Sequence, residues 1–212
     1  MNRHFPRPDL SHVAAEIAAA AARLVVEDGM EYGPAKHQAL QLLGLPGRTP
    51  LPGNDLLEAE VRDYIALFCP STQALDLQAL RALALVWMLR LQAFRPHVGG
   101  AVWRGTATRR NDVYLQLFCD DSKSAEIALI DQRVAYDVQT VTGFTGDRVD
   151  ALSIQNFCTE LAQNVSVHLM IYDYDDLKGA LRKDGQGAAL RGDAVALQRL
   201  LDGADLMAKS AP

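Results

Sequence analysis

Residues suited to phosphate chemistry gather around Gly105 and Thr106, which form a turn of small residues. Small side chains let a phosphate group approach the backbone closely. Three arginines accompany this turn in the sequence: Arg104, Arg109 and Arg110. Because a guanidinium group donates paired hydrogen bonds to phosphate oxygens, these residues predict a phosphate-binding site. The arginines are also consistent with a solvated loop, and the sequence leaves both interpretations open.

An acidic residue follows this turn at the head of an alternating apolar pattern. Asp112 precedes Val113, and Tyr114 stands two residues beyond Asp112. Residues i and i+2 of a strand project from the same face, so a carboxylate at each position would hold two Mg²⁺ ions about 4 Å apart. With tyrosine at the second position, Asp112 is the candidate catalytic and metal-binding residue. Alternatively, Asn111 and Asp112 form a turn before a plain strand.

Later segments carry further polar candidates. Alternation in "VSVHLMIY", residues 165–172, predicts a strand on which His168 is a polar position. A neutral imidazole is a poor magnesium ligand, and a lone histidine on a strand is more typical of a structural residue. The acidic run 173–176 is typical of a helix cap. The three cysteines lack zinc-site spacing and predict reduced thiols in a cytoplasmic protein: Cys69, Cys119 and Cys158.

The bulk properties set limits on partners. The 212 residues carry a formal charge of −5, and 49% of them are hydrophobic. This length allows a full core in one domain, or in one domain with a small appendage. The negative charge gives no general attraction to nucleic acid, and no apolar run of 18 residues predicts a membrane span. We therefore expect a cytoplasmic protein without a membrane or nucleic-acid partner, while the oligomeric state stays open.

The hydrophobic period changes along the chain. Helical spacing predicts four helices near residues 10–28, 34–44, 54–69 and 76–94. Asn54 is expected to cap the third of these helices, and the fourth is apolar around so much of its circumference that we expect it to be buried between layers. Beyond Pro96, period-2 alternation and β-branched residues predict strands near residues 101–106, 113–118, 134–142, 149–157 and 165–172. Helices are expected between and after them, near residues 122–132, 177–181 and 194–201.

This order predicts an α+β fold, in which a helical N-terminal half is followed by a mixed β-sheet with flanking helices. We place the helical region at residues 1–72 and the α+β domain at residues 73–212. The candidate site residues all fall in the second of these regions.

The stretch "RGTATRRNDVYLQLF", after a long predicted helix, resembles the core of the nucleotidyltransferase superfamily, which has the polymerase-β-like fold. In that family a long helix precedes a strand ending in Gly-Gly or Gly-Ser, a short loop, and a strand reading Asp-x-Asp. A third carboxylate lies on a later strand. The whole chain also resembles a family of short bacterial proteins, some of which are labelled UDP-N-acetylmuramate–alanine ligase. Such a ligase needs a Gly-rich ATP loop ending in Gly-Lys-Thr or Gly-Lys-Ser, which this sequence lacks.

The resemblance assigns roles residue by residue. It matches Gly105 and Thr106 to the Gly-Ser turn and Asp112 to the first carboxylate, while Tyr114 and His168 stand at the second and third positions. It therefore implies a nucleotidyltransferase-like pseudoenzyme that binds a nucleotide, another phosphate ligand or a protein partner. The alternative that it implies is an active nucleotidyltransferase that uses Mg²⁺ and a nucleoside triphosphate, with further ligands from elsewhere in the chain.

Residues 17–47 offer a different alternative, because they resemble the first helices of a TetR-type repressor. A recognition helix presents basic and hydroxyl side chains to DNA. The expected helix 34–44 offers only Lys36, His37 and glutamines, and the helix after it is acidic. A DNA-binding regulator is therefore the weaker alternative.

Overall fold

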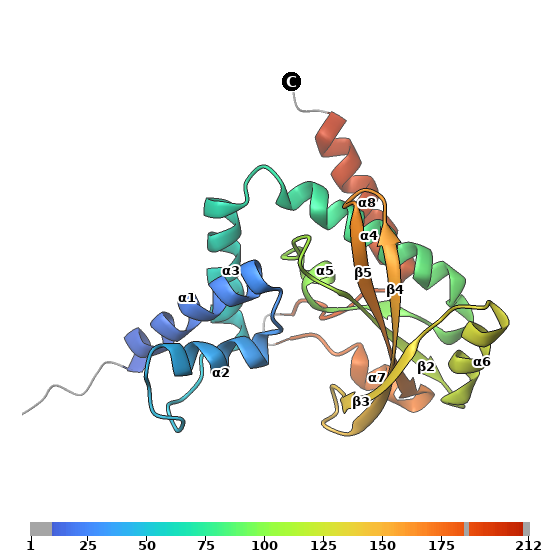
Figure 1. The fold of residues 1–212 in the computed structure, drawn as a ribbon, viewed down its shortest axis with the longest axis horizontal. Helices are drawn as coiled ribbons and strands as arrows, with labels where there is room; N and C mark the ends of the chain where they lie inside the picture. The colour runs from blue at the N-terminus through green and yellow to red at the C-terminus, as the bar shows by residue number, and fades with distance from the viewer. Residues whose placement is uncertain (1–9, 185–186, 210–212) are drawn as a thin grey trace, which may run out of the picture. The chain divides into compact units, whose positions relative to one another are not determined.

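A computed structural model describes residues 10–184 and 187–209 of the chain. The chain forms two compact units, residues 1–72 and 73–212. Each unit has a hydrophobic core of its own. Figure 1 shows the elements of both units in chain order by colour.

The described part of the first unit contains three helices, α1 (Leu10–Asp28), α2 (Tyr32–Leu42) and α3 (Asn54–Phe68). Helix α1 contacts both of the others, and its buried apolar residues form one core with theirs. The expected cap of α3 is corrected here, since the N-cap residue is Gly53 and Asn54 is already helical. The Asn54 side chain instead accepts a hydrogen bond from Lys36 Nζ at 2.6 Å.

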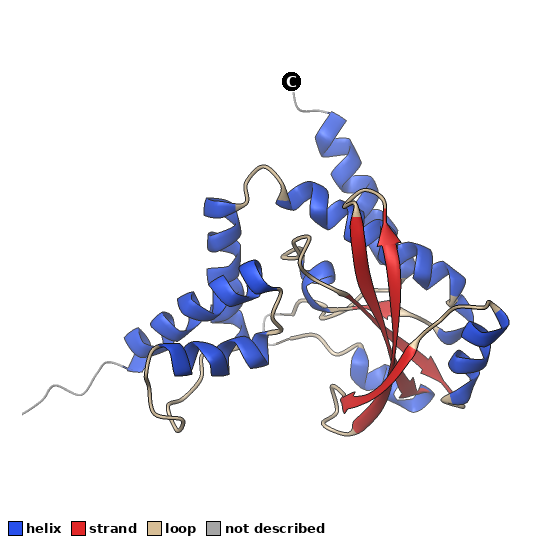
Figure 2. Ribbon diagram, in the orientation of Figure 1, coloured by secondary structure: helices blue, strands red, loops and turns tan. Residues whose placement is uncertain are grey.

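The described residues of the second unit form one mixed sheet of five strands in the order β1-β2-β5-β4-β3 (Figure 2). Its strands are β1 (His97–Val98), β2 (Val113–Cys119), β3 (Asp137–Thr142), β4 (Arg148–Cys158) and β5 (Gln163–Asp173). The central pair β2 and β5 is parallel, and the other neighbours are antiparallel. The predicted α+β class, with a helical front and a mixed sheet, is therefore confirmed.

The helices of this unit are α4 (Gln73–Arg90), α5 (Gly100–Arg104), α6 (Lys123–Asp131), α7 (Leu177–Ala180) and α8 (Ala194–Lys209), with 3₁₀ turns at η1 (Gln92–Phe94) and η2 (Tyr174–Asp176). The expected strand 101–106 is wrong, because these residues form α5. The reason is tertiary. Gly105 ends the helix at φ 84°, and Arg81 donates to the carbonyl groups of Val102 and Trp103. The arginine thus satisfies groups that a helix end leaves open.

The two faces of the sheet differ in composition. One face packs against α4, α5, α6 and α8, and its alternate strand residues are apolar and buried, as Leu115, Leu169 and Ile154 illustrate. Helix α4 was expected to be buried between layers, but its outer surface is open to solvent, and Leu75 there is 68% exposed. The helices therefore cover the sheet in a single layer on this side.

The opposite face is covered by apolar contacts at one end only. Phe118 and Tyr172 pack there with Ala180 of α7. Toward the start of β2, the same face carries half-buried polar side chains, including Tyr114, His168 and Ser153. The candidate site lies at this polar end. No described helix is long and apolar enough to cross a membrane.

Candidate functional site

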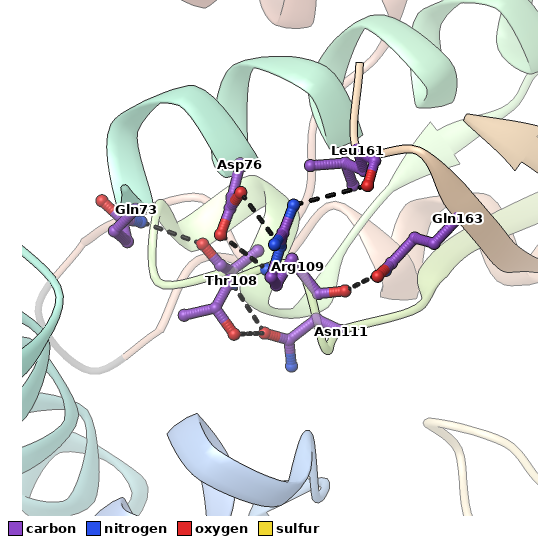
Figure 3. A network of polar contacts seen from close by, with 8 residues as sticks. Gln73, Asp76, Thr108, Arg109, Asn111, Leu161 and Gln163 are labelled. Atoms are coloured by element: carbon purple, nitrogen blue, oxygen red, sulfur yellow. Dashed lines mark hydrogen bonds and ion pairs between the residues drawn. The ribbon is translucent and has the colours of Figure 1, made fainter. Parts of the chain in front are cut away.

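The segment 105–112, here called the anchored loop, connects α5 to β2. Gln73, in the first turn of α4, donates from its side-chain amide to the carbonyl groups of Gly105 and Ala107, at 3.0 Å each. These bonds hold the predicted phosphate-binding turn against the first turn of α4, where Figure 3 labels Gln73. The Gly105 carbonyl therefore accepts a hydrogen bond from within the protein.

Arg109 is held by its backbone and by its side chain. Its N–H donates to Asp76 Oδ2 at 3.1 Å, and its Nε lies 3.6 Å from Asp76 Oδ1. The guanidinium also donates to the carbonyl of Leu161, and the Arg109 carbonyl accepts from Gln163 (Figure 3). Asp76 is buried, so this carboxylate is an anchor inside the fold. The structure thus shows structural partners for Arg109, one of the three arginines predicted to bind phosphate.

The end of the anchored loop is a side-chain-stabilised turn. Asn111 Oδ1 accepts from the Thr108 N–H at 2.8 Å, and the Asn111 N–H donates to the Thr108 carbonyl at 2.9 Å. Both side chains are buried. This turn delivers the chain to Asp112 immediately before β2, so the Asn-Asp turn predicted as one alternative is present and also positions the carboxylate.

Asp112 is joined to strand β5 by two hydrogen bonds that the sequence did not predict. Its Oδ2 lies 3.2 Å from His168 Nε2 on β5, and Oδ1 accepts from the Ser166 N–H at 3.3 Å. His168 Nδ1 lies 2.8 Å from Ser153 Oγ on β4. Ser153 pairs directly with His168 across the strands. The result is a continuous Ser153–His168–Asp112 relay across the polar end of the open face.

Electrostatics favour the ionised form of Asp112. Partial burial by itself raises the pKa of this carboxyl, but hydrogen bonds from His168 and Ser166, with the charge of His168, outweigh burial and lower the pKa below its usual value. An ionised carboxylate only accepts hydrogen bonds. His168 Nε2 must therefore carry the proton that faces Asp112. In the neutral ring, Nδ1 then accepts, and the Ser153 hydroxyl donates to it.

Tyr114 adds an aromatic contact to the relay. It pairs with His168 across the parallel strands β2 and β5. The two rings stack with centroids 4.8 Å apart and an interplanar angle of 25°. Tyr114 therefore takes the place where the resemblance expects a second carboxylate and supports the imidazole of His168 instead.

The glycines after β1 were not identified as a site from the sequence. Gly99 and Gly100 directly follow β1, and the Gly99 N–H donates to the Tyr114 carbonyl at 3.2 Å. Gly100 has φ 64°, and a Cβ there would meet open space. Gly99 and Gly100 thus lead from β1 into α5, and Gly105 ends that helix. The sequence signal that could have identified them is the Gly-Gly pair itself, which lies between the long helix and Asp112.

The donor set does not fit a magnesium pair. Around Asp112 the structure places an imidazole, a phenol ring and a serine, which are weak ligands for Mg²⁺ compared with carboxylates. Across the described residues, no group of three or more His, Cys, Asp or Glu side chains could hold a metal ion. We therefore derive no chemistry through a metal.

The remaining predicted residues are placed as follows. Arg104 is the last residue of α5 and is half-buried, whereas Arg110 is exposed on the anchored loop. Thr106 is 1% exposed, and its Oγ1 has no hydrogen-bond partner among the described residues. The Thr106 hydroxyl is therefore buried away from any ligand at the surface.

An acidic cleft lies elsewhere in this unit. Its volume is about 340 Å³, and Tyr172 lines it together with the carboxylates Asp147, Asp150, Asp173 and Asp176. Asp173 accepts from the Asp175 N–H and so caps the 3₁₀ turn η2, whereas Asp176, the N-cap residue of α7, makes no side-chain cap hydrogen bond. The four carboxylates outnumber the one arginine in the lining, Arg148, so the cleft has a net negative charge. This charge repels an anionic ligand, and a phosphate group is not expected there.

The first unit does not favour DNA binding. Lys36, a basic residue of the supposed recognition helix, is buried and bonded to Asn54, and burial lowers its pKa. Residues 29–31 join α1 to α2, and this turn has the length that a helix-turn-helix uses. The scarcity of basic side chains on α2, rather than the turn, therefore disfavours the repressor alternative.

Comparisons with protein-family models, with curated proteins and with solved structures gave no match for this chain.

Proposed function

We propose that residues 73–212 form a nucleotidyltransferase-like domain that binds a nucleotide without magnesium and lacks metal-dependent nucleotidyl transfer. The observation that carries this proposal is the pairing of Asp112 with His168. In the resemblance, both positions belong to metal ligands, and here the two side chains bind each other. The imidazole of His168 thus takes the place beside the Asp112 carboxylate that a metal ion would have in the family.

The order of elements supports the same proposal. A long helix, α4, is followed by β1, by Gly99 and Gly100, and then by β2 with Asp112 at its head. Apart from α5, which lies between the glycines and β2, this is the order of the family pattern. Gly99 and Gly100 follow a strand, as the glycines of that pattern do, whereas Gly105 follows a helix. Because space is open beside Gly100, we place the phosphate group of the ligand there.

The test is thermal unfolding with each common nucleoside triphosphate, with and without Mg²⁺. A ligand at about 100 times its Kd adds roughly 2.7 kcal/mol to the free energy of unfolding. We expect stabilisation that is independent of Mg²⁺ and that persists in Asp112→Ala. A protein that no nucleotide stabilises would contradict the proposal.

The alternative, an active metal-dependent enzyme, gives a different result. Stabilisation would then require Mg²⁺ and would disappear in Asp112→Ala. A reconstruction sharpens the distinction, since Tyr114→Asp with His168→Asp places three carboxylates at the family positions. We expect Mg²⁺ to stabilise this double variant but not the wild type. The control is Tyr114→Asn with His168→Asn, which has similar size but lacks the added charges.

A further inference from the structure

We propose that Ser153 is an activated nucleophile, with His168 as its general base and Asp112 as the group that orients the base. This activity goes beyond nucleotide binding and needs neither nucleotide nor metal. It concerns the same polar end of the open sheet face, where three strands bring together residues that lie far apart in the sequence.

The distances satisfy the requirements of nucleophilic catalysis. Ser153 Oγ lies 2.8 Å from His168 Nδ1, within the reach of direct proton transfer. His168 Nε2 lies 3.2 Å from Asp112 Oδ2. The base is therefore oriented by a third group, which is the arrangement found in hydrolases of unrelated folds.

The hydrogen-bond directions also agree with this role. The carboxylate of Asp112 fixes the proton of the imidazole on Nε2, so Nδ1 presents a lone pair to the serine. The Tyr114 ring stacks on His168 and limits its rotation. The serine hydroxyl is thus prepared to lose its proton to the ring.

The relay is accessible from solvent. The side chain of Asp112 is 40% exposed and that of His168 is 21% exposed, while Ser153 is half-buried. Asp137 on β3 pairs directly with Ser153 and is exposed. Since its carboxylate repels anions, we expect the electrophile to be a neutral or cationic ester.

The step balances as an acyl transfer. Ser153 Oγ forms a bond to the ester carbonyl carbon, and its proton passes to His168 Nδ1. The ester C–O bond breaks, and the leaving alkoxide takes this proton and departs as an alcohol. Water repeats the attack on the acyl-serine and frees Ser153 with release of a carboxylic acid.

The position of Ser153 within the sheet sets the expected rate. Strand β4 pairs with β3 on one side and β5 on the other, so its backbone N–H groups serve the two ladders. A tetrahedral oxyanion would therefore lack backbone donors, whose loss costs about 10²–10³ in rate. We expect both acylation and deacylation of Ser153 to be slow, because each step passes through such an oxyanion.

The test uses the full chain and a fluorophosphonate probe, which forms a Ser–O–P bond and releases HF. Intact mass and peptide mapping should find a single label on Ser153. We expect Ser153→Ala to abolish the label and His168→Gln to slow its formation about 100-fold or more. The matched control is Ser124→Ala, which removes another half-buried serine, on α6, and should label at the wild-type rate.

Two outcomes would overturn the proposal. One is folded wild-type protein that leaves Ser153 unlabelled, and the other is His168→Gln that labels as fast as wild type. If His168→Gln unfolds, Ser153→Cys gives a second measurement with iodoacetamide. The new thiol should react faster than Cys69, which is likewise only partly buried. Equal reactivity would contradict activation by His168. Because no nucleotide is present, either result is independent of the nucleotide-binding test.

Discussion

Two polar networks meet at the start of β2, and they use their atoms differently. The network around the anchored loop, with Gln73, Asp76 and Gln163, bonds mainly to backbone groups of residues 105–109. The Ser153–His168–Asp112 relay instead joins side chains to one another, apart from one bond to the Ser166 amide. A network that satisfies backbone groups fixes where the chain runs, because an unsatisfied buried amide is costly. A network of side chains fixes protonation and reactivity.

The largest expected effect comes from the first network. Asp76→Ala removes the buried acceptor of the Arg109 N–H, and we expect a loss of about 1–3 kcal/mol in the free energy of unfolding by urea titration. Trypsin should also cleave faster at Arg109 and Arg110. The control is Arg109→Ala, whose side chain is 55% exposed and should contribute less than about 1 kcal/mol. Equal losses in the two variants would remove the distinction between backbone and side-chain anchoring.

The second network should show its effect through pH. The folded state lowers the pKa of Asp112 below its ordinary value of 3.8, so the ionised form contributes stability above that pH. This contribution is lost as pH falls through the lowered pKa. We therefore expect the stability advantage of wild type over Asp112→Asn to shrink as the pH falls below about 4. Urea titrations at several pH values measure this difference in the free energy of unfolding. A difference that grows as the pH falls would contradict a lowered pKa of Asp112.

The smallest expected effect concerns a group that belongs to neither network. Thr106 Oγ1 is buried with no hydrogen-bond partner in the described structure. Thr106→Val replaces this hydroxyl with a methyl group, and we expect stability to rise by about 0–1 kcal/mol. Thr106→Ser keeps the hydroxyl, loses a buried methyl group, and should cost about 1 kcal/mol. If the valine variant is the less stable one, the hydroxyl has a partner such as bound water.

Much of the fold was predictable because its signals are local. Alternation placed β2 and β5, since every second residue of each, such as Leu115 and Leu169, faces the helices. The short segment 101–106 was misassigned because six residues carry little periodicity, and the helix α5 found there depends on Arg81 from another element. Trp103 is half-buried and donates to the Ala189 carbonyl, a contact with no local signal in the sequence.

The candidate site was predictable only in part. The residue type and position of Asp112 marked it as the carboxylate of interest, and His168 was recognised as a polar position on its strand. Ser153 was missed because nothing in its own strand distinguishes it from an ordinary solvated serine. It becomes part of a site only through pairing with His168.

The sequence alone determined the α+β class, the helical first half, and the single carboxylate with tyrosine two residues later, because composition and period are properties of neighbouring residues. Only the tertiary structure decided what Asp112 binds. Strand order and register bring residues 112, 153 and 168 within hydrogen-bonding distance, and this register is set by the burial of alternate apolar side chains along whole strands. No local pattern around any one of the three residues contains that information.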